Sequence, residues 1–332
     1  MRVAFAGTAP FAAVALEAIL QAGHAVPLVL TQPDRPAGRG LKPRASAVSE
    51  LASARGLSLL SPGSLRADPG SAGAAEALDR LRSAVPDLLV VAAYGLILPQ
   101  SVLDVPSGIA GRSGVVRAVN IHASLLPRWR GAAPVARAIE AGDRVTGITL
   151  MQMEAGLDSG PILLSEAIPI DSTDTTGTLT DGLAQLGARL IVSWLKQAPA
   201  GSWASVPQPA AGVSYARKIA RHEAWLSWGE PAAVLARRVR AFDPEPGACS
   251  LLGEGLVKIW SAEAGPLAAT ADPGTVVSAA VDGIGVACGD GVLMIHELQR
   301  AGGRRLRARE FLAGTPLPVG TRWQTPTAAA PR

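Results

Sequence analysis

Cysteine is scarce in this sequence, and long apolar runs are missing. The 332 residues include two cysteines, Cys249 and Cys288, and neither has a Cys or His neighbour at the spacing of a metal site. This usage excludes a disulfide framework and favours two structural thiols in a reducing, cytoplasmic location. No apolar stretch approaches the roughly 20 residues that a membrane span needs, so we expect no membrane partner. Because neither cysteine has neighbours at metal-ligand spacing, we also expect no metal.

Glycine is sparse in the first turn of the chain, Gly7-Thr8-Ala9-Pro10. A dinucleotide-binding fold needs three glycines there, so a nicotinamide role is not supported. The same N-terminal segment has one basic residue and apolar stretches, as a signal peptide does. However, Gly7 and Pro10 interrupt it and Glu17 lies in its helical part, so a first strand and helix explain it better.

The composition is otherwise that of a globular protein, with 48% apolar and 17% charged residues, which excludes a disordered chain. Net charge is only +4, but basic residues cluster in two segments, 31–44 and 299–309. Such clusters suit a polyanion such as nucleic acid, although ordinary solvated loops also explain them. Their basic residues are Arg35, Arg39, Lys42 and Arg44 in the first, and Arg300, Arg304, Arg305, Arg307 and Arg309 in the second.

Strand-like and helical segments alternate up to residue 197, which predicts an α/β fold with a doubly wound, Rossmann-like, mostly parallel sheet. The expected strands are 2–7, 25–32, 57–62, 87–95, 117–123, 145–154 and 161–170, and the expected helices are 11–23, 46–56, 74–85, 134–143 and 178–198.

Residues 198–213 are rich in Pro, Ala, Gly and Ser without any period, which predicts a linker. Beyond it come one amphipathic helix, 231–242, and regular short strands broken by Gly and Pro, which predict a smaller β-barrel of OB type. We therefore expect a catalytic domain at 1–197, the linker, a C-terminal domain at 214–325 and a frayed tail at 326–332, in a monomer.

Two stretches carry residues suited to chemistry. In VNIHASLLPRWRGAAP, Asn120 and His122 are two apart on a predicted strand, so their side chains share one face near its carboxyl end, where α/β sheets bind ligands. In GITLMQMEAGLDSG, Asp158 lies between two glycines in a sharp turn that can present a carboxylate. Taken singly, these residues are better explained as a turn cap, a buried histidine and an ordinary hairpin turn.

Together these stretches resemble the folate-dependent formyltransferases, and further segments extend the resemblance along nearly the whole chain: VAFAGT, TQPDRPAGRG, VVAAYGLILP, YARKIARHEAWLSW and DGVLMIHELQRAGGRRLRAREFLAG. The loop PDRPAGRG, the extension RWRGAAP and the domain after the linker separate the branch that formylates methionyl initiator tRNA from the branch that acts on glycinamide ribonucleotide. The chain resembles the former.

The resemblance implies a transferase that moves a formyl group from 10-formyltetrahydrofolate, a cosubstrate, to the α-amine of methionine on initiator tRNA, for translation initiation. It implies that Asn120 and His122 donate hydrogen bonds to the oxyanion, and that Asp158 orients His122 and accepts or relays the amine proton. No metal is needed. The folate would lie against Tyr94, Ile97 and Leu98 on one side and Ser124, Leu125, Leu126 and Pro127 on the other.

The resemblance also assigns the basic clusters to the tRNA. Arg39, between Gly38 and Gly40, would reach bases, while Arg35, Lys42 and Arg44 would contact phosphates. Arg304, Arg305 and Arg307 would add salt-dependent affinity from the barrel domain.

The chain departs from the family pattern in the segment 107–118, SGIAGRSGVVRA, which is longer than usual and predicts a Gly- and Ser-rich surface loop. Three alternatives remain at this stage: a formyltransferase acting on a nucleotide or sugar amine, a nucleic-acid-binding protein with an inactive α/β domain, and a nicotinamide-dependent oxidoreductase.

Overall fold

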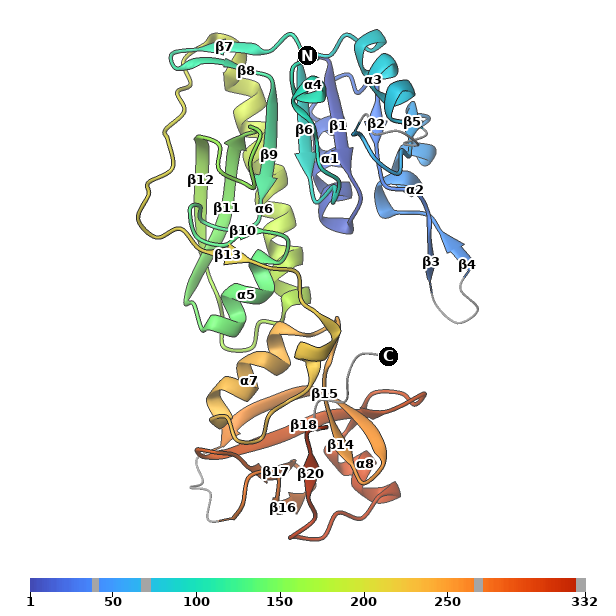
Figure 1. The fold of residues 1–332 in the computed structure, drawn as a ribbon, viewed down its shortest axis with the longest axis vertical. Helices are drawn as coiled ribbons and strands as arrows, with labels where there is room; N and C mark the ends of the chain where they lie inside the picture. The colour runs from blue at the N-terminus through green and yellow to red at the C-terminus, as the bar shows by residue number, and fades with distance from the viewer. Residues whose placement is uncertain (38–41, 67–72, 266–270, 327–332) are drawn as a thin grey trace. The chain divides into compact units, whose positions relative to one another are not determined.

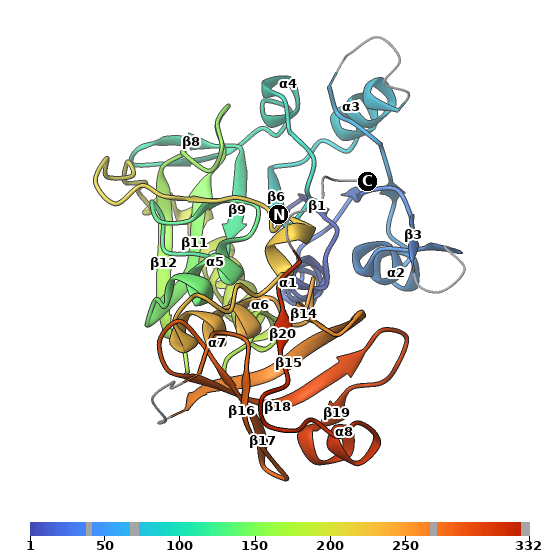
Figure 2. The same ribbon diagram turned by 60° about the horizontal axis from the view of Figure 1, so that its bottom comes forward.

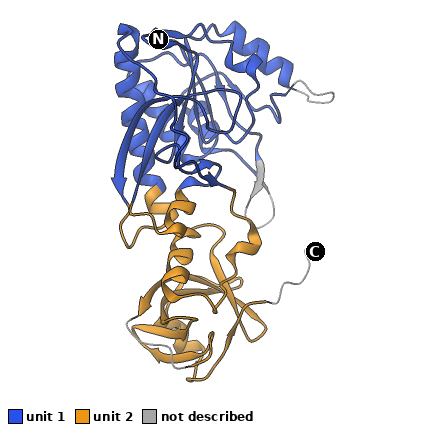
Figure 3. Cartoon of the chain, turned by 60° about the vertical axis from the view of Figure 1, so that its left-hand side comes forward, with its two compact units in different colours: residues 1–134, 145–169, 180–216 blue, residues 135–144, 170–179, 217–332 orange. Residues whose placement is uncertain are grey.

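The computed structural model describes residues 1–37, 42–66, 73–265 and 271–326, which divide into two compact units (Figure 3). The first unit contains Met1–Pro134, Val145–Pro169 and Thr180–Ala216, and the second contains Val135–Arg144, Ile170–Leu179 and Arg217–Arg332. The units are therefore interleaved in sequence. The predicted division at 197 and 214 stays a prediction.

The first unit is built on a seven-stranded sheet in the order β12-β11-β9-β6-β1-β2-β5 (Figure 1). The pairs β5–β2, β2–β1, β1–β6 and β6–β9 are parallel, and β11 is antiparallel to β9 and to β12. The predicted Rossmann-like, mostly parallel sheet is confirmed. Its strands are β1 (Val3–Gly7), β2 (Val29–Leu30), β5 (Leu59–Leu60), β6 (Leu88–Ala92), β9 (Ala118–His122), β11 (Val145–Gln152) and β12 (Ile162–Pro169).

Apolar residues on both faces of this sheet bury it between helices. On one face Ala4, Leu89 and Ala118 join a buried cluster with residues of α3 (Ala74–Ser83) and α4 (Gln100–Leu103). On the other face α6 (Thr176–Gln197) comes so close to β9 that a Cβ on Gly187 would lie 2.9 Å from Cγ2 of Ile121. Small residues at such contacts bring the sheet and its helices together, as the apolar strand pattern predicts.

Two further helices, α1 (Pro10–Gln21) and α2 (Ala47–Ala54), lie against the strands that come first in the chain. They also pack against each other. A Cβ on Gly7 would lie only 2.6 Å from the Cβ of Ala12, so this glycine lets α1 begin directly against the end of β1. The first turn therefore uses its glycine for packing.

Two segments expected to be loops form hairpins instead. The basic segment forms β3 (Arg35–Ala37) and β4 (Lys42–Arg44), and the 107–118 segment forms β7 (Ile109–Gly111) and β8 (Gly114–Val116). The second hairpin has tertiary support that sequence does not reveal. A Cβ on Gly111 would lie 2.2 Å from the Trp203 ring, and the Arg112 amide donates to the Trp203 carbonyl at 3.0 Å.

The second unit contains a curled antiparallel sheet of β14 to β18 with β20, onto which β19 adds beside β18. Near its two outer strands the Val276 amide donates to the Thr321 carbonyl at 2.8 Å, and the Trp323 amide donates to Gly274 at 2.7 Å. The predicted small barrel is thus confirmed as a sheet that curls until these segments meet. Its strands are β14 (Ala248–Leu252), β15 (Gly255–Gly265), β16 (Val276–Ala280), β17 (Gly283–Ala287), β18 (Val292–Arg300), β19 (Leu306–Arg307) and β20 (Trp323–Gln324).

Helices α7 (Ala232–Ala241) and α8 (Ala308–Gly314) complete this unit, with α8 beside β18 and β19 (Figure 2). Most of α5 (Pro134–Ala141) also belongs to it. Arg137 on α5 forms ion pairs with Glu140 at 2.6 Å and Glu223 at 2.8 Å. The hydrogen bond from Arg137 holds the pKa of Glu223 below its ordinary value.

Residues 170–179 are tied into the second unit by backbone carbonyls. The Thr176 hydroxyl donates to the Ala241 carbonyl at 2.6 Å, and the Arg240 guanidinium donates to the Asp174 carbonyl at 2.9 Å. Residues 135–144 and 170–179, which precede the predicted linker, are therefore integral parts of the second unit.

Candidate active site

Strand β9 presents Asn120 and His122 from the same face, as period-two alternation predicts. Asn120 is paired with Val91 of β6 on one side and Met151 of β11 on the other, so it lies in the middle of the sheet. His122 is 5% exposed and ends the strand. Both side chains therefore sit at the carboxyl edge of rigid, buried strands.

Asp158 comes to this edge from the turn between β11 and β12. Its Oδ1 accepts a hydrogen bond from Asn120 Nδ2 at 3.3 Å, and its Oδ2 lies 3.7 Å from His122 Nδ1. Oδ2 also accepts from the Gly131 amide at 2.8 Å. Two side chains of β9 and one backbone amide thus surround the carboxylate of Asp158.

The backbone of Asp158 has φ +51°, in the left-handed region that few non-glycine residues adopt. Asp tolerates this conformation better than most residues. Here it turns the chain so that the carboxylate faces Asn120. Strain of this kind persists only where surrounding contacts hold it.

The ring of His122 is fixed by the chain that follows it. Its Nε2 lies 2.9 Å from the carbonyl oxygen of Trp129, and because a carbonyl only accepts, Nε2 carries the hydrogen. Nδ1, which faces Asp158, is therefore the nitrogen left for chemistry. It can accept a proton when the ring is neutral or donate a hydrogen bond when the ring is protonated.

The NH2 group of Asn120 has two hydrogens, and within the part of the chain that the structure describes Asp158 takes one, which leaves the other for a ligand. The site thus offers an oriented donor, a histidine nitrogen and a carboxylate within one cluster. That set can stabilise a developing oxyanion and receive a proton from an attacking nucleophile.

The turn after β9 holds four of the residues that sequence assigned to folate. Ser124 is fully buried, and its hydroxyl donates to the Arg128 carbonyl at 2.6 Å. The Thr149 hydroxyl donates to the Ser124 carbonyl at 2.7 Å and accepts from the Leu126 amide at 3.1 Å. Leu126 is buried, whereas Leu125 and Pro127 are partly exposed and can face a ligand.

The other predicted folate residues divide between core and surface. Tyr94 and Leu98 belong to the buried cluster under α3 and α4, whereas Ile97 is 62% exposed. Burial raises the pKa of the Tyr94 phenol well above its ordinary value, so the group stays neutral. Ile97 is thus the member of this group whose side chain reaches the surface.

Sequence reasoning missed Gln208, which lies in the predicted linker, and Ser214, which is the first residue of the predicted C-terminal domain. Residues 203–216, here called the strap, run along the first unit: the Ile162 and Val206 amides exchange hydrogen bonds with each other's carbonyls at 2.8 Å, and β13 (Tyr215–Ala216) pairs with β10 (Arg130–Gly131). The Ser214 hydroxyl accepts from the Trp129 amide at 3.0 Å. Coil-like composition gave no signal of these contacts.

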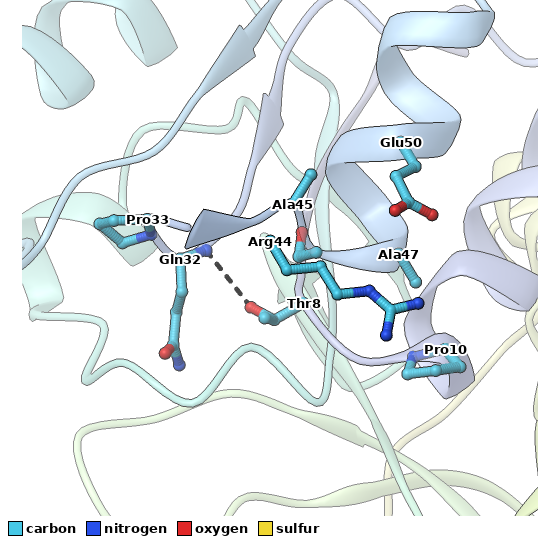
Figure 4. Close-up of a pocket in the computed structure, with 9 residues that line it drawn as sticks. Thr8, Pro10, Gln32, Pro33, Arg44, Ala45, Ala47 and Glu50 are labelled. Atoms are coloured by element: carbon cyan, nitrogen blue, oxygen red, sulfur yellow. Dashed lines mark hydrogen bonds between the residues drawn. The ribbon is translucent and has the colours of Figure 1, made fainter. Parts of the chain in front are cut away.

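A pocket of about 390 Å³ opens at the same carboxyl edge of the sheet, beside the ends of β1 and β2 (Figure 4). Thr8 and Gln32 line it, and the Gln32 backbone amide donates to the Thr8 hydroxyl at 3.3 Å. Arg44 extends toward Pro10, and Glu50 stands on α2. The pocket combines a cation, a carboxylate, hydroxyls and prolines. This lining suits a ligand whose polar end carries negative charge.

The predicted tRNA residues of the basic hairpin lie on its two strands, Arg35 on β3 with Lys42 and Arg44 on β4. Arg39 lies outside the described residues. In the second unit Arg304 and Arg307 are exposed. Arg305 stacks on the Trp260 ring with its Cζ 3.7 Å from the centroid and pairs with Asp243 at 2.7 Å.

Among the described residues, no group of three or more His, Cys, Asp and Glu is arranged to hold a metal ion. Within that same part of the chain, no helix has the length and apolarity needed to cross a membrane.

Comparison with known proteins gives two family matches. The formyl transferase family model matches residues 1–195, and the formyl transferase C-terminal domain model matches residues 218–316. The chain is 56% identical to the methionyl-tRNA formyltransferase of Burkholderia thailandensis, over 99% of each chain. It is 57% identical to the protein of that name from Burkholderia multivorans, over 99% of this chain and 98% of the relative.

Solved structures share the fold at low identity. An N-formyltransferase of Helicobacter canadensis, in complex with folinic acid and dTDP-3-aminofucose, superposes with a TM-score of 0.64 at 15% identity, covering 92% of this chain and 100% of that one. HypX of Aquifex aeolicus in complex with tetrahydrofolic acid gives a TM-score of 0.59 at 16% identity, covering 94% of this chain. The match spans about half of HypX, 47% of its length.

Proposed function

Because the chain belongs to the formyl transferase family, in its methionyl-tRNA formyltransferase branch, we propose that it transfers the formyl group of 10-formyltetrahydrofolate to the α-amine of methionine on initiator tRNA. It is a formyltransferase, and enzymes of this family take the formyl group from a folate derivative. The observation that carries the proposal is the meeting of Asn120, His122 and Asp158 at the carboxyl edge of the sheet.

The proposed chemistry uses these three groups without a covalent enzyme intermediate. The amine nitrogen attacks the formyl carbon, and the carbonyl oxygen becomes an oxyanion that accepts hydrogen bonds from Asn120 and from protonated His122. Asp158 orients His122 and accepts the proton that leaves the amine, directly or through water. The carbon–nitrogen bond to the folate then breaks, and the folate nitrogen takes up a proton to give tetrahydrofolate.

We propose that the folate lies beside this cluster, between the segments 94–98 and 124–127. Leu125, Pro127 and Ile97 are the members that face solvent and can contact it directly. Tyr94, Leu98, Ser124 and Leu126 would support the walls from beneath, because their side chains are buried.

We propose that the basic hairpin and the second unit bind the tRNA, with the catalytic domain at 1–197 and the tRNA-binding domain at 214–325. Arg44 supports this assignment, since it lines a pocket at the same edge of the sheet as Asn120. Arg35 and Lys42 lie on the strands of the same hairpin, Arg39 belongs in sequence to the basic segment 31–44, and Arg304, Arg305 and Arg307 belong to the second unit. The enzyme would act in the cytoplasm as a monomer.

Formyl transfer from 10-formyltetrahydrofolate tests the proposal directly. We expect rapid formylation of methionyl initiator tRNA and none above background with free methionine, glycinamide ribonucleotide or an amino-sugar nucleotide. Preference for any of the small amines over the charged tRNA would overturn the assignment of the acceptor. Absence of transfer to every amine would overturn the activity itself.

A further inference from the structure

The strap passes directly over the two turns that build the candidate active site. In Figure 1 the chain leaves α6, descends beside β12 and reaches β13 next to β10. Besides the paired strands, the Arg130 amide donates to the Ser214 carbonyl at 2.9 Å, and the Ala132 amide donates to the Ala216 carbonyl at 2.9 Å. The segment 203–216 is therefore an ordered part of the first unit.

One side chain of the strap, Gln208, bonds to both turns at once. Its Nε2 donates to the carbonyl of Asp158 at 2.8 Å and to the carbonyl of Gly160 at 2.8 Å. Its Oε1 accepts from Arg130 Nε at 3.0 Å and from Nη2 at 2.7 Å. These four bonds use both amide hydrogens and both oxygen lone pairs, so the side chain is completely satisfied.

The groups held by Gln208 are those that orient the cluster. Asp158 needs its left-handed backbone to aim the carboxylate, and Gln208 bonds to the carbonyl of that same residue. Arg130 lies between Trp129, whose carbonyl fixes His122, and Gly131, whose amide bonds to Asp158. A single side chain thus joins the turn that carries the carboxylate to the turn that positions the histidine.

We propose that Gln208 is a positioning residue for formyl transfer, which holds Asp158 in register with Asn120 and His122. This inference rests on the proposed function of that cluster. The bonds of Gln208 go to the Arg130 side chain and to the carbonyls of Asp158 and Gly160, so it acts through the two turns. Misplacing a reacting group by about 1 Å can cost about 100-fold in rate, which is the scale of effect that such a clamp controls.

The first test is a comparison of kcat and KM in Gln208→Ala. We expect kcat to fall about 10- to 100-fold, while KM for the folate and for the tRNA each change less than about threefold. Gln197→Ala is the matched control, because Gln197 ends α6 and, among the described residues, its side chain bonds only to Ser193, at 3.3 Å. It should keep wild-type kinetics. A wild-type kcat in folded Gln208→Ala, or a loss confined to KM, overturns the proposal.

Gln208→Glu tests the two ends of the Gln208 side chain separately, and it keeps the proposal testable if the alanine variant does not fold. A carboxylate still accepts from Arg130 but cannot donate to the carbonyls of Asp158 and Gly160. We expect its kcat to fall as far as that of Gln208→Ala. Wild-type activity in Gln208→Glu would show that the grip on the Asp158 turn is unimportant, which contradicts the proposal.

A double-mutant cycle distinguishes positioning from general stabilisation. If Gln208 acts through Asp158, then adding Gln208→Ala to Asp158→Asn should lower the remaining rate by less than about twofold, whereas independent effects would multiply. Multiplication overturns the proposal. Failure of wild-type enzyme to formylate any amine would instead sink the proposed function, and that result is obtained before any variant is compared.

Discussion

The cluster around Asp158 in the first unit and the exposed arginines of the second unit hold their polar groups in different ways. In the first unit, the side chains around Asp158 are bonded to backbone atoms at defined positions, as with His122 to Trp129 and Gln208 to Gly160. In the second unit, exposed arginines lie over rings, as Arg300 does over Phe311 with 5.2 Å between Cζ and the centroid. Bond formation needs groups placed to fractions of an ångström, whereas attraction of a phosphate chain needs only charge near a surface.

Removing a member of the catalytic cluster should have the largest effect. Asn120→Ala removes the proposed oxyanion donor and should lower the rate at saturating substrate about 100- to 1000-fold. Asp158→Ala removes the proposed proton acceptor and should lower this rate about 100- to 10,000-fold. Single-turnover formylation measures the chemical step. Asp79→Ala, an exposed carboxylate on α3, is the control. Near-wild-type turnover in a folded Asn120 or Asp158 variant would sink their assignment.

The next largest effect concerns the basic hairpin. We expect Arg39→Ala to weaken use of methionyl-tRNA by about 1–3 kcal/mol, or about 10- to 200-fold in kcat/KM, because a base contact is lost. Folate binding, followed by fluorescence titration, should be unchanged. Equal losses of both affinities would point to misfolding of the hairpin and leave Arg39 without a role in recognition.

A smaller effect is expected for the arginines of the second unit, and it should differ between Arg305 and the other two. Arg304→Ala and Arg307→Ala should each reduce the salt slope of tRNA binding by about 1 and weaken binding to all tRNAs alike. Arg305→Ala should change the slope less and lower stability by about 1 kcal/mol, because it loses a ring contact and an ion pair. Filter binding across a salt series and thermal unfolding check this. A larger change of salt slope in Arg305→Ala than in Arg304→Ala and Arg307→Ala would contradict this division of roles.

The smallest effect should come from the two thiols, both in the second unit. Burial raises the pKa of Cys249 to about 11 and of Cys288 to about 11, so at pH 8 the reactive thiolate is scarce. A disulfide reagent should leave the native protein unlabelled and active, and should label both thiols in urea. Since both cysteines belong to that unit, the labelling rate reports its opening. Rapid labelling of native protein would contradict their burial.

What sequence could predict depended on how local each signal was. Asn120 and His122 follow from strand alternation, and the sharp turn at Asp158 follows from its flanking glycines. The hairpin at 109–116 depends on Trp203, and the bonds of Gln208 span 48 and 50 residues, so neither leaves a local pattern. Sequence could not decide whether Tyr94, which is buried, lines a ligand or belongs to the core, because apolar ligand walls and apolar core have the same composition.

The interleaving of the units limits how this protein can be recombined with its relatives. A chimera joined at residue 217 would take Glu223 and Arg240 from one parent, and Arg137 and Asp174 from the other. A successful graft of the second unit would therefore have to bring residues 135–144 and 170–179 along with 217–332. Exchange of substrate-recognition parts by a single crossover is thus hindered, and the chain is expected to be inherited as one block.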